Sequence, residues 1–452
     1  MPPRTLAAFQ RVMAGAVNSI RLSLGIGAAV LALASPAEAR RRPLPAPAAP
    51  VVTYAPRPTD APLWFWNKKV DPAVGVLATV LVNAPAEGIV DGAQRAAEVN
   101  RAAALALSGK PDDTAAANRI VSSAWAAYVQ AIKAPTPGMI YAYASLKPQN
   151  TERATILRSA AAASDLSRHL EQVAALNPIY SALRAEAIKR YKANGGFADE
   201  ALIENLARAR SLPPGGRYIL VNTAQQRLWM FEDGKPVGSM RVVVGMPDLA
   251  TPLIASYVHY ATLNPYWNVP DHLVKKTVAA NTVKTGLKYL TAHGYQVMSD
   301  WTDKAEVVPA ASVDWKAVAD GGKMVRVREL PGGANSMGKM KFTFPNGQGI
   351  FMHDTPEKEL LDKDVRTFSN GCIRLEDAPR LGEWLLGRPP VAEGSDPEQL
   401  VKLPQGVPVF VTYLTTMPVD GRLVTVSDVY GWDRSPSKQI AAAEFLPTGA
   451  RD

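Results

Sequence analysis

The chain has 452 residues, of which 47% are hydrophobic and 20% charged, a balance typical of a globular protein with a buried core. Its length allows two or three domains. The formal net charge is +9, but there is no zinc-finger spacing, no RNA-binding aromatic motif and no basic tract beyond residues 40–42, so the sequence gives no support for nucleic acid as a partner.

The first 39 residues have the pattern of a secretory signal peptide. Arg4, Arg11 and Arg21 form a basic region before an apolar run at 22–34, and an A-x-A cleavage pattern ends at Ala39. The run is too short to span a bilayer comfortably, although an uncleaved N-terminal anchor is the alternative interpretation. Both interpretations place the rest of the chain outside the cytoplasm, and no later stretch predicts a transmembrane helix.

The next two segments differ in composition. Residues 40–62 are rich in proline and alanine and predict an extended linker. Residues 63–210 are alanine-rich with helical periodicity and predict a helical scaffold domain. Within it, we expect helices at 114–134, 151–176, 178–192 and 198–210.

Residues 211–432 predict a mainly β domain, so that the expected fold class is α+β. Asp233-Gly234 lies between two strand-like runs and indicates a hairpin. The segment 271–336 is more irregular and predicts an insertion or lid, and 433–452 predict a C-terminal tail. We expect strands at 217–222, 226–232, 239–245, 255–263, 340–345, 349–354 and 408–414, and a short helix at 378–386.

Cys372 is the only cysteine of the chain. Exported proteins usually carry cysteines in disulfide pairs, so a single one predicts either an inert buried thiol or a nucleophile. A cysteine nucleophile needs a base to take its proton. His353 is the candidate, because it follows a strand, precedes Asp354 and lies near the cysteine in sequence. The other histidines have simpler interpretations as packing, surface or insertion residues: His169, His259, His272 and His293.

The residues around the cysteine suit acyl transfer. Gly371 permits a tight turn, after which its amide and that of Cys372 could point at a developing oxyanion. Arg374 suits recognition of a carboxylate, and the alternative is a structural ion pair with Glu376 or Asp377. We expect no metal, because no cluster has metal-ligand spacing, and no cofactor.

This pattern resembles the signature of the L,D-transpeptidases with a YkuD-type catalytic domain. The resemblance rests on His353, fifteen further residues, and then Ser369-Asn370-Gly371-Cys372-Ile373-Arg374. Asn370 stands where the family usually has a second histidine. Other segments are similar to the larger periplasmic murein enzymes of the YcbB type, which carry a helical scaffold and an insertion that caps the active site: 177–191, 263–270, 331–346 and 351–361.

The resemblance implies a periplasmic enzyme of peptidoglycan synthesis that is open to inactivation by carbapenems. Cys372 would form a thioester with the diaminopimelate of a tetrapeptide stem, release D-alanine and pass the acyl group to an amine of a second stem. His353 would be the base, oriented by the backbone of Asp354 or a nearby group, and Gly371 would help to hold the oxyanion. The expected substrate-binding residues are Arg374, Ser369, Asn370, Tyr266 and Trp267.

Three alternatives remain at this stage. The same site could hydrolyse the thioester, which would make the protein an L,D-carboxypeptidase. It could also transfer the acyl group to a protein and anchor that protein to the wall. The non-enzymatic alternative is an inactive scaffold that binds the cell wall.

Overall fold

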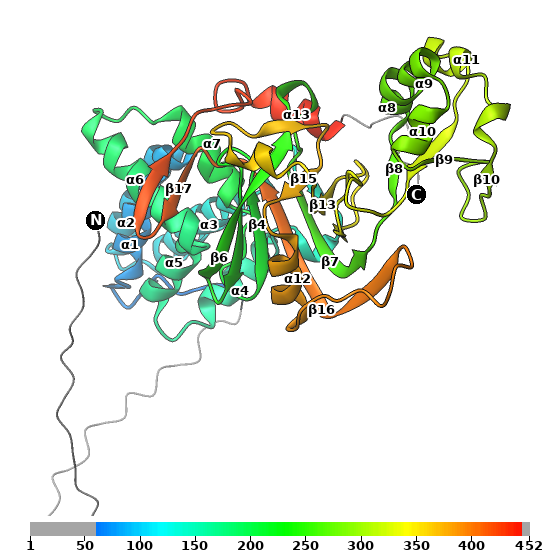
Figure 1. Ribbon diagram of the computed structural model, residues 1–452. Helices are drawn as coiled ribbons and strands as arrows, with labels where there is room; N and C mark the ends of the chain where they lie inside the picture. The colour runs from blue at the N-terminus through cyan, green and yellow to red at the C-terminus, as the bar shows by residue number, and fades with distance from the viewer. Residues whose placement is uncertain (1–59, 445–452) are drawn as a thin grey trace, which may run out of the picture. The chain divides into compact units, whose positions relative to one another are not determined.

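The computed structural model describes residues 60–444 (Figure 1). The signal peptide expected at 1–39 lies outside the described residues, as do most of the linker expected at 40–62 and the end of the tail expected at 433–452. Among the described helices, none has the length and apolar character needed to cross a membrane.

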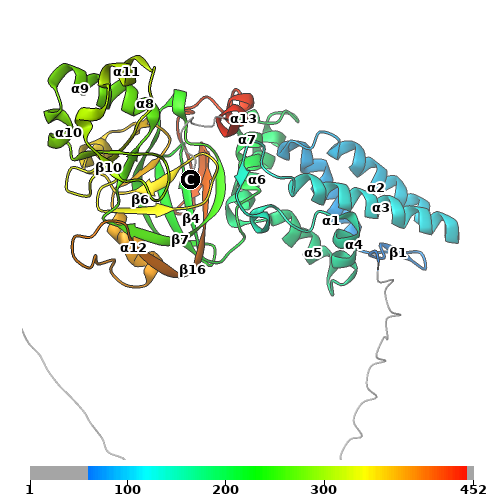
Figure 2. The same cartoon turned by 90° about the vertical axis from the view of Figure 1, so that its right-hand side faces the viewer.

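The first helices pack around a hydrophobic core of their own. α1, α2 and α3 lie side by side (Figure 2), and Trp64, Leu77 and Trp125 are completely buried in this core. Their burial removes a large apolar area from water, which is the main stabilising contribution to such a bundle. The elements are β1 (Phe65–Trp66), β2 (Lys69–Val70), α1 (Ala73–Asn83), α2 (Gly92–Ala106), α3 (Pro111–Ile132), α4 (Arg153–Ala161) and α5 (Leu166–Ala175).

The prediction of one helix over 151–176 is wrong, because the structure has α4 and α5 with a break between them. The Asp165 carboxylate accepts a hydrogen bond of 3.0 Å from the backbone N–H of Arg168. An aspartate in this position satisfies an amide that has no partner within the helix, and therefore favours a new helix start over continuation.

The next two helices share the hydrophobic core of the β domain. α6 (Pro178–Ala193) starts at the cap residue Asn177, and α7 (Glu200–Ala209) starts at Asp199. Their buried leucines, among them Leu183 and Leu206, belong to the same cluster as the strands. The sequence assigns both helices to the scaffold, whereas in the structure they pack with the sheet.

The β domain is built on a sheet with the strand order β12-β13-β15-β6-β5-β4-β16-β7-β3. β12 also pairs with β7, so the sheet closes on itself around a core of alternating inward-facing side chains. β14 adds a parallel pairing to β6. The strands are β3 (Ile140–Tyr141), β4 (Tyr218–Asn222), β5 (Arg227–Glu232), β6 (Lys235–Gly245), β7 (Ile254–Leu263), β12 (Met340–Thr343), β13 (Phe351–His353), β14 (Thr367–Ser369), β15 (Ile373–Leu375) and β16 (Gln399–Thr412).

The hairpin between β5 and β6 has the predicted turn. Asp233 and Gly234 both have positive φ, 47° and 76°, as the two central residues of a type I′ turn require. β6 begins at Lys235 rather than at 239, because the strand continues directly from this turn. α12 (Ala378–Leu386) matches its predicted span.

The inserted segment forms a lobe with its own sheet and core (Figure 1). Its sheet has the strand order β10-β9-β11-β8. Val278 and Trp315 are buried in one hydrophobic cluster with Val327 of this sheet. The segment therefore has a regular fold, although the sequence pattern is irregular. The lobe starts before the predicted boundary at 271, because β8 (Trp267–Val269) pairs with β11 in its sheet. Its further elements are α8 (Asp271–Leu273), α9 (Ala280–Thr285), α10 (Lys288–Ala292), β9 (Tyr295–Met298), β10 (Val307–Val308), α11 (Trp315–Asp320) and β11 (Arg326–Glu329).

The C-terminal segment is tied to α7 by a completely buried arginine. Nε of Arg208 donates to Oε1 of Gln439 at 2.6 Å, its Nη2 donates to the Trp432 carbonyl at 3.0 Å, and its guanidinium pairs with Asp433. The residues beyond 433, which were expected to form a tail, are thus anchored as far as they are described. This part contains β17 (Thr416–Val419), β18 (Arg422–Thr425) and α13 (Pro436–Glu444).

Candidate active site

His353 is the last residue of β13 and is only 5% exposed. Its Nδ1 lies 2.6 Å from the backbone carbonyl oxygen of Asp354. A carbonyl can only accept, so Nδ1 carries the proton and Nε2 of the neutral ring is left as an acceptor. The backbone therefore selects the tautomer in which Nε2 can act as a base.

The Asp354 carboxylate makes other contacts. One oxygen accepts the backbone N–H of Lys339 at 3.0 Å, and the other pairs with Nζ of Lys358 at 2.7 Å. The imidazole is thus oriented by the Asp354 carbonyl, while the side chain fixes the loop that follows β13.

The pairing of β13 with β15 brings the candidate residues to one face of the sheet. The strands are parallel, with Met352 opposite Ile373 and His353 opposite Arg374. Successive side chains of a strand point to opposite faces. Met352 and Ile373 are completely buried in the core, so His353 and Arg374 share the other face. Cys372 directly precedes β15, two residues before Arg374.

Burial favours the neutral forms of both candidate residues. It raises the pKa of the Cys372 thiol, against smaller opposing effects of the Phe351 backbone N–H and the Arg374 charge. It lowers the pKa of His353 to about 4, although the hydrogen bond with the Asp354 carbonyl opposes that shift. The half-buried thiol lies 3.8 Å from the Gly349 carbonyl oxygen, within reach as a weak donor. The neutral forms of the thiol and of the imidazole are therefore both favoured in the resting state.

Hydrogen bonds hold the loop before Cys372 in place. The Ser369 hydroxyl accepts the Gly371 N–H at 3.1 Å and donates to the Cys372 carbonyl at 2.6 Å. The Thr251 hydroxyl donates to the Gly371 carbonyl at 2.7 Å. Gly371 has φ +117°, a conformation that side chains rarely tolerate. Thr251 was not among the predicted residues, because no local pattern marks it.

These contacts change the expected roles of two loop residues. The Gly371 amide already has the Ser369 hydroxyl as its acceptor, so in this structure it is not free for an oxyanion. Ser369 is 2% exposed and bonds within the loop, where a substrate-facing side chain was expected. Asn370 is exposed.

Arg374 forms an ion pair with Glu357. The partners considered from the sequence are wrong: Glu376 pairs with Arg241 at 2.7 Å, and Asp377 caps α12. Arg374 keeps only 21% of its side-chain surface exposed, whereas Glu357 keeps 53%. The charged pair therefore lies at the surface of the site, where replacing Glu357 by another anion costs little free energy.

A groove of about 640 Å³ lies between the insertion and the part of the β domain that carries Arg374. Trp267 and Tyr295 line it from the insertion, and Glu357, Glu359 and Arg374 line it from the β domain. Trp267, an expected substrate-binding residue, thus lies in the wall of this groove. Tyr266 has a different environment, because its ring lies against the Arg328 guanidinium at 4.0 Å and its N–H donates to Glu398 at 2.7 Å.

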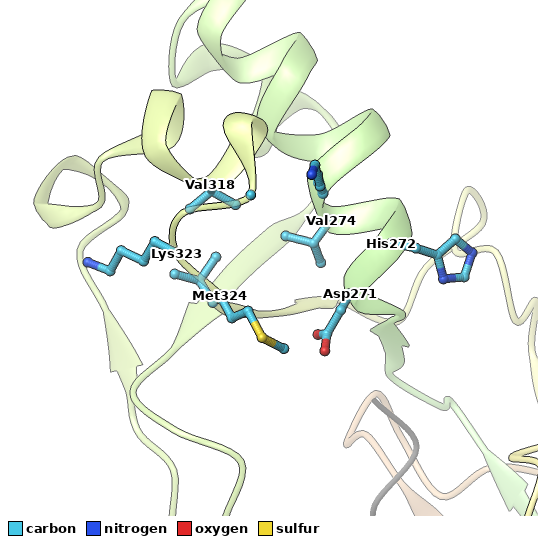
Figure 3. Close-up of a pocket in the computed structure, with 9 residues that line it drawn as sticks. Asp271, His272, Val274, Val318, Lys323 and Met324 are labelled. Atoms are coloured by element: carbon cyan, nitrogen blue, oxygen red, sulfur yellow. The ribbon is translucent and has the colours of Figure 1, made fainter. Parts of the chain in front are cut away.

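A second cavity, of about 250 Å³, lies wholly within the insertion. In Figure 3 the carboxylate of Asp271 lies beside Met324, and the His272 ring points away from both. All of its lining residues fall between 271 and 325, so it is separate from the Cys372 face. Within residues 60–444, no group of three or more His, Cys, Asp or Glu side chains could hold a metal ion.

Comparison with known families agrees with this geometry. Residues 216–411 match the family model of the L,D-transpeptidase catalytic domain, YkuD, and residues 53–186 match that of the Scaffold domain. The chain is thus similar to the L,D-transpeptidases over its catalytic segment and to their scaffold over its helical segment. The predicted resemblance to this family, and the α+β class with a helical N-terminal scaffold, are thereby confirmed.

One curated relative is a putative L,D-transpeptidase of Haemophilus influenzae, which is 27% identical over 328 residues. The match covers 70% of this chain and 65% of the relative. Among solved structures, the Ldtfm–avibactam carbamoyl enzyme and a mutant of the Enterococcus faecium L,D-transpeptidase are each 16% identical. Their matches cover 43% and 44% of this chain, and 48% and 51% of theirs, with TM-scores of 0.21, which are too low to support an argument.

Proposed function

We propose that the protein is a peptidoglycan L,D-transpeptidase in which Cys372 is the nucleophile and His353 the base. The observation that carries the proposal is the parallel pairing of β13 and β15, which sets His353 opposite Arg374, two residues after Cys372. The Asp354 carbonyl holds Nδ1 protonated and leaves Nε2 for the thiol proton.

In the first half-reaction the thiol attacks as its proton leaves, because the resting pair is neutral. The sulfur bonds to the carbonyl carbon of diaminopimelate in a tetrapeptide stem, and Nε2 of His353 takes the thiol proton. The bond from that carbon to the nitrogen of D-alanine then breaks, and the imidazolium gives its proton to the leaving amine. A thioester on Cys372 and free D-alanine result.

In the second half-reaction an amine of another stem attacks the thioester. The new carbon–nitrogen bond forms, the carbon–sulfur bond breaks, and His353 moves the amine proton to the sulfur. The overall change joins two stems and releases one D-alanine. We propose the Cys372 amide as an oxyanion donor, joined by the Gly371 amide when the Ser369 hydroxyl turns away. Removing one such donor typically slows a reaction on the order of 100-fold to 1000-fold.

The signal-like residues 1–39 and the family assignment support a periplasmic location at the cell wall. Tetrapeptide stems are then the partners as donor and acceptor, and a wall-anchored protein is the alternative acceptor. A carbapenem would acylate the same sulfur. Residues 53–186, which match the Scaffold domain, would support the catalytic domain.

The test is incubation of the purified mature chain with disaccharide-tetrapeptide, followed by mass spectrometry. We expect a product equal to two substrates minus one D-alanine, and no product from Cys372→Ala or His353→Gln. His169→Gln, in a helix of the scaffold, is the matched histidine control and should keep activity. A tripeptide product without dimer would indicate a hydrolase. No product together with no carbapenem adduct would contradict an enzymatic role.

A further inference from the structure

Lys358 is bonded to the loop that follows β13, and no step of the proposed reaction uses it. It begins the 3₁₀ turn η6 (Lys358–Asp362), four residues beyond Asp354. We propose that Lys358 is a positioning residue, which holds and neutralises the Asp354 carboxylate so that the neighbouring His353 stays unprotonated in a mildly acidic medium. This inference rests on the proposed role of His353 as the base and adds the group that controls its charge.

All three N–H donors of the Lys358 ammonium have partners. Nζ donates to Oδ1 of Asp354 at 2.7 Å and to the carbonyl oxygens of Leu375 and Glu376 at 3.2 Å and 2.9 Å. An ammonium has three donors and no acceptor, so its capacity is filled. Leu375 is the last residue of β15. The charge is therefore fixed between the ends of β13 and β15, although 48% of the Lys358 side chain is exposed.

The Asp354 carboxylate has a place of its own, apart from the imidazole. Nδ1 of His353 is taken by the Asp354 carbonyl. One carboxylate oxygen receives Lys358, and the other receives the backbone N–H of Lys339 at 3.0 Å. A Cβ on Gly338 would lie 2.5 Å from Oδ2 of Asp354, so a glycine is needed to leave this space. The carboxylate side chain is only 11% exposed and therefore depends on Lys358, more than on water, for its neutralisation.

The other charges that face His353 are cations with partners of their own. Lys341 lies opposite His353 on β12, and Arg374 lies opposite it on β15. Lys341 pairs with Glu398 at 3.4 Å, and Arg374 pairs with Glu357. Each charge beside the imidazole thus belongs to an ion pair, and Lys358 completes the pair that contains the nearest anion.

Loss of the Lys358 charge would disturb this balance in one direction. Burial lowers the pKa of His353 to about 4, and the flanking cations act in the same direction, while the Asp354 carbonyl and carboxylate oppose it. Without its cation the carboxylate would act more strongly on the buried ring, and an opposite charge at such short range typically moves a pKa by about 1 to 3. A protonated ring has no acceptor left at Nε2 and cannot take the thiol proton of Cys372.

The experiment measures the protonation of His353 directly. The imidazole is followed by ¹⁵N NMR through a pH titration of the Cys372→Ala protein, and His353→Gln assigns the signal. Lys358→Gln removes the charge but keeps N–H donors for the two backbone carbonyls. We expect its titration midpoint to lie about one pH unit or more above that of Cys372→Ala alone. An unchanged midpoint would overturn the proposal.

Two further variants separate the charge from a loosened structure. Asp354→Asn removes the carboxylate, so the combination of Lys358→Gln with Asp354→Asn should bring the midpoint back down. A midpoint that stays high in this combination would show that Lys358 acts through packing, and the proposal would be wrong. Lys363→Gln is the matched control, because Lys363 is an exposed lysine directly after η6, and it should leave the midpoint unchanged.

Turnover connects the charge to the reaction. At pH 5, kcat/KM for D-alanine release should be lower in Lys358→Gln than in Lys363→Gln by about 2-fold or more, whereas at pH 7 the two should differ little. An equal loss at both pH values would contradict control through charge. Absent D-alanine release from the wild type would refute the proposed function, whereas the NMR midpoints test Lys358 without turnover, so the two failures are distinct.

Discussion

Nδ1 of His353 lies 2.6 Å from the carbonyl oxygen of Asp354, the residue that follows it. A backbone carbonyl carries no net charge, so it fixes the tautomer of the ring with little stabilisation of an imidazolium. Burial then determines the protonation state, and it lowers the pKa of His353 to about 4. The imidazole is thus neutral at neutral pH, and burial favours the protonated thiol of Cys372.

The first prediction concerns the acid limb of the reaction. The base is neutral in the free enzyme until the pH falls toward the lowered pKa of His353, about 4. We expect kcat/KM for D-alanine release to be nearly constant between about pH 6 and pH 8 and to fall only well below that range. A midpoint close to the ordinary histidine value, about 6.5, would contradict the buried neutral imidazole.

The same shift makes folding depend on pH. Between about pH 6.5 and pH 4 the unfolded chain binds a proton at His353 that the folded chain does not, so stability falls as the pH is lowered through this window. The contribution is at most about 3 kcal/mol. Denaturant unfolding at a series of pH values measures this. The free energy of unfolding should fall less between about pH 6.5 and pH 4 in His353→Gln than in the wild type.

A third prediction distinguishes the neutral pair from a thiolate–imidazolium pair. Burial raises the pKa of Cys372, so alkylation by iodoacetamide should be slow at neutral pH and should rise only on the alkaline side of the ordinary thiol pKa. Rates are followed by mass spectrometry from about pH 5 to pH 10. A plateau of fast alkylation between about pH 5 and pH 8 that disappears in His353→Gln would show that the ion pair forms before substrate.

Gly371 offers a test of the loop conformation. A Cβ at this position would lie 2.9 Å from Cδ1 of Ile350, and φ is +117°. Gly371→Ala should therefore cost about 1–3 kcal/mol and strongly reduce acylation of Cys372. Ile350→Val removes the clashing methyl group, so the double variant should recover part of the thermal stability. No recovery would show that the backbone strain alone sets the cost.

Arg208 should be important for stability although it is far from the cysteine in sequence. Arg208→Met would leave Asp433, only 7% exposed in its side chain, without its buried partner. Loss of one member of a buried ion pair typically costs about 3–5 kcal/mol. Arg434→Ala is the control, because its side chain is 81% exposed. Similar melting temperatures for the two variants would be inconsistent with this account.

The sequence by itself determined those features that local chemistry dictates. Runs of β-branched and aromatic residues predicted most of the longer strands of the β domain, Asp233-Gly234 specified the type I′ turn, and the span of α12 follows from its periodicity and cap. The strand-end position of His353, its acidic neighbour and its nearness to the only cysteine marked His353 and Cys372 as candidates, and their catalytic roles remain predictions.

Only the tertiary structure decided which groups meet across long separations. Arg374 pairs with Glu357 rather than with its neighbours in sequence, and Thr251 bonds the carbonyl of Gly371 from 120 residues away. Asp165 is a local signal for the break between α4 and α5. The helical periodicity of 151–176 nevertheless led to the prediction of one continuous helix. Contacts such as those of Thr251 and Arg208 depend on strand register and helix packing, which are set by burial of the whole core rather than by any local segment.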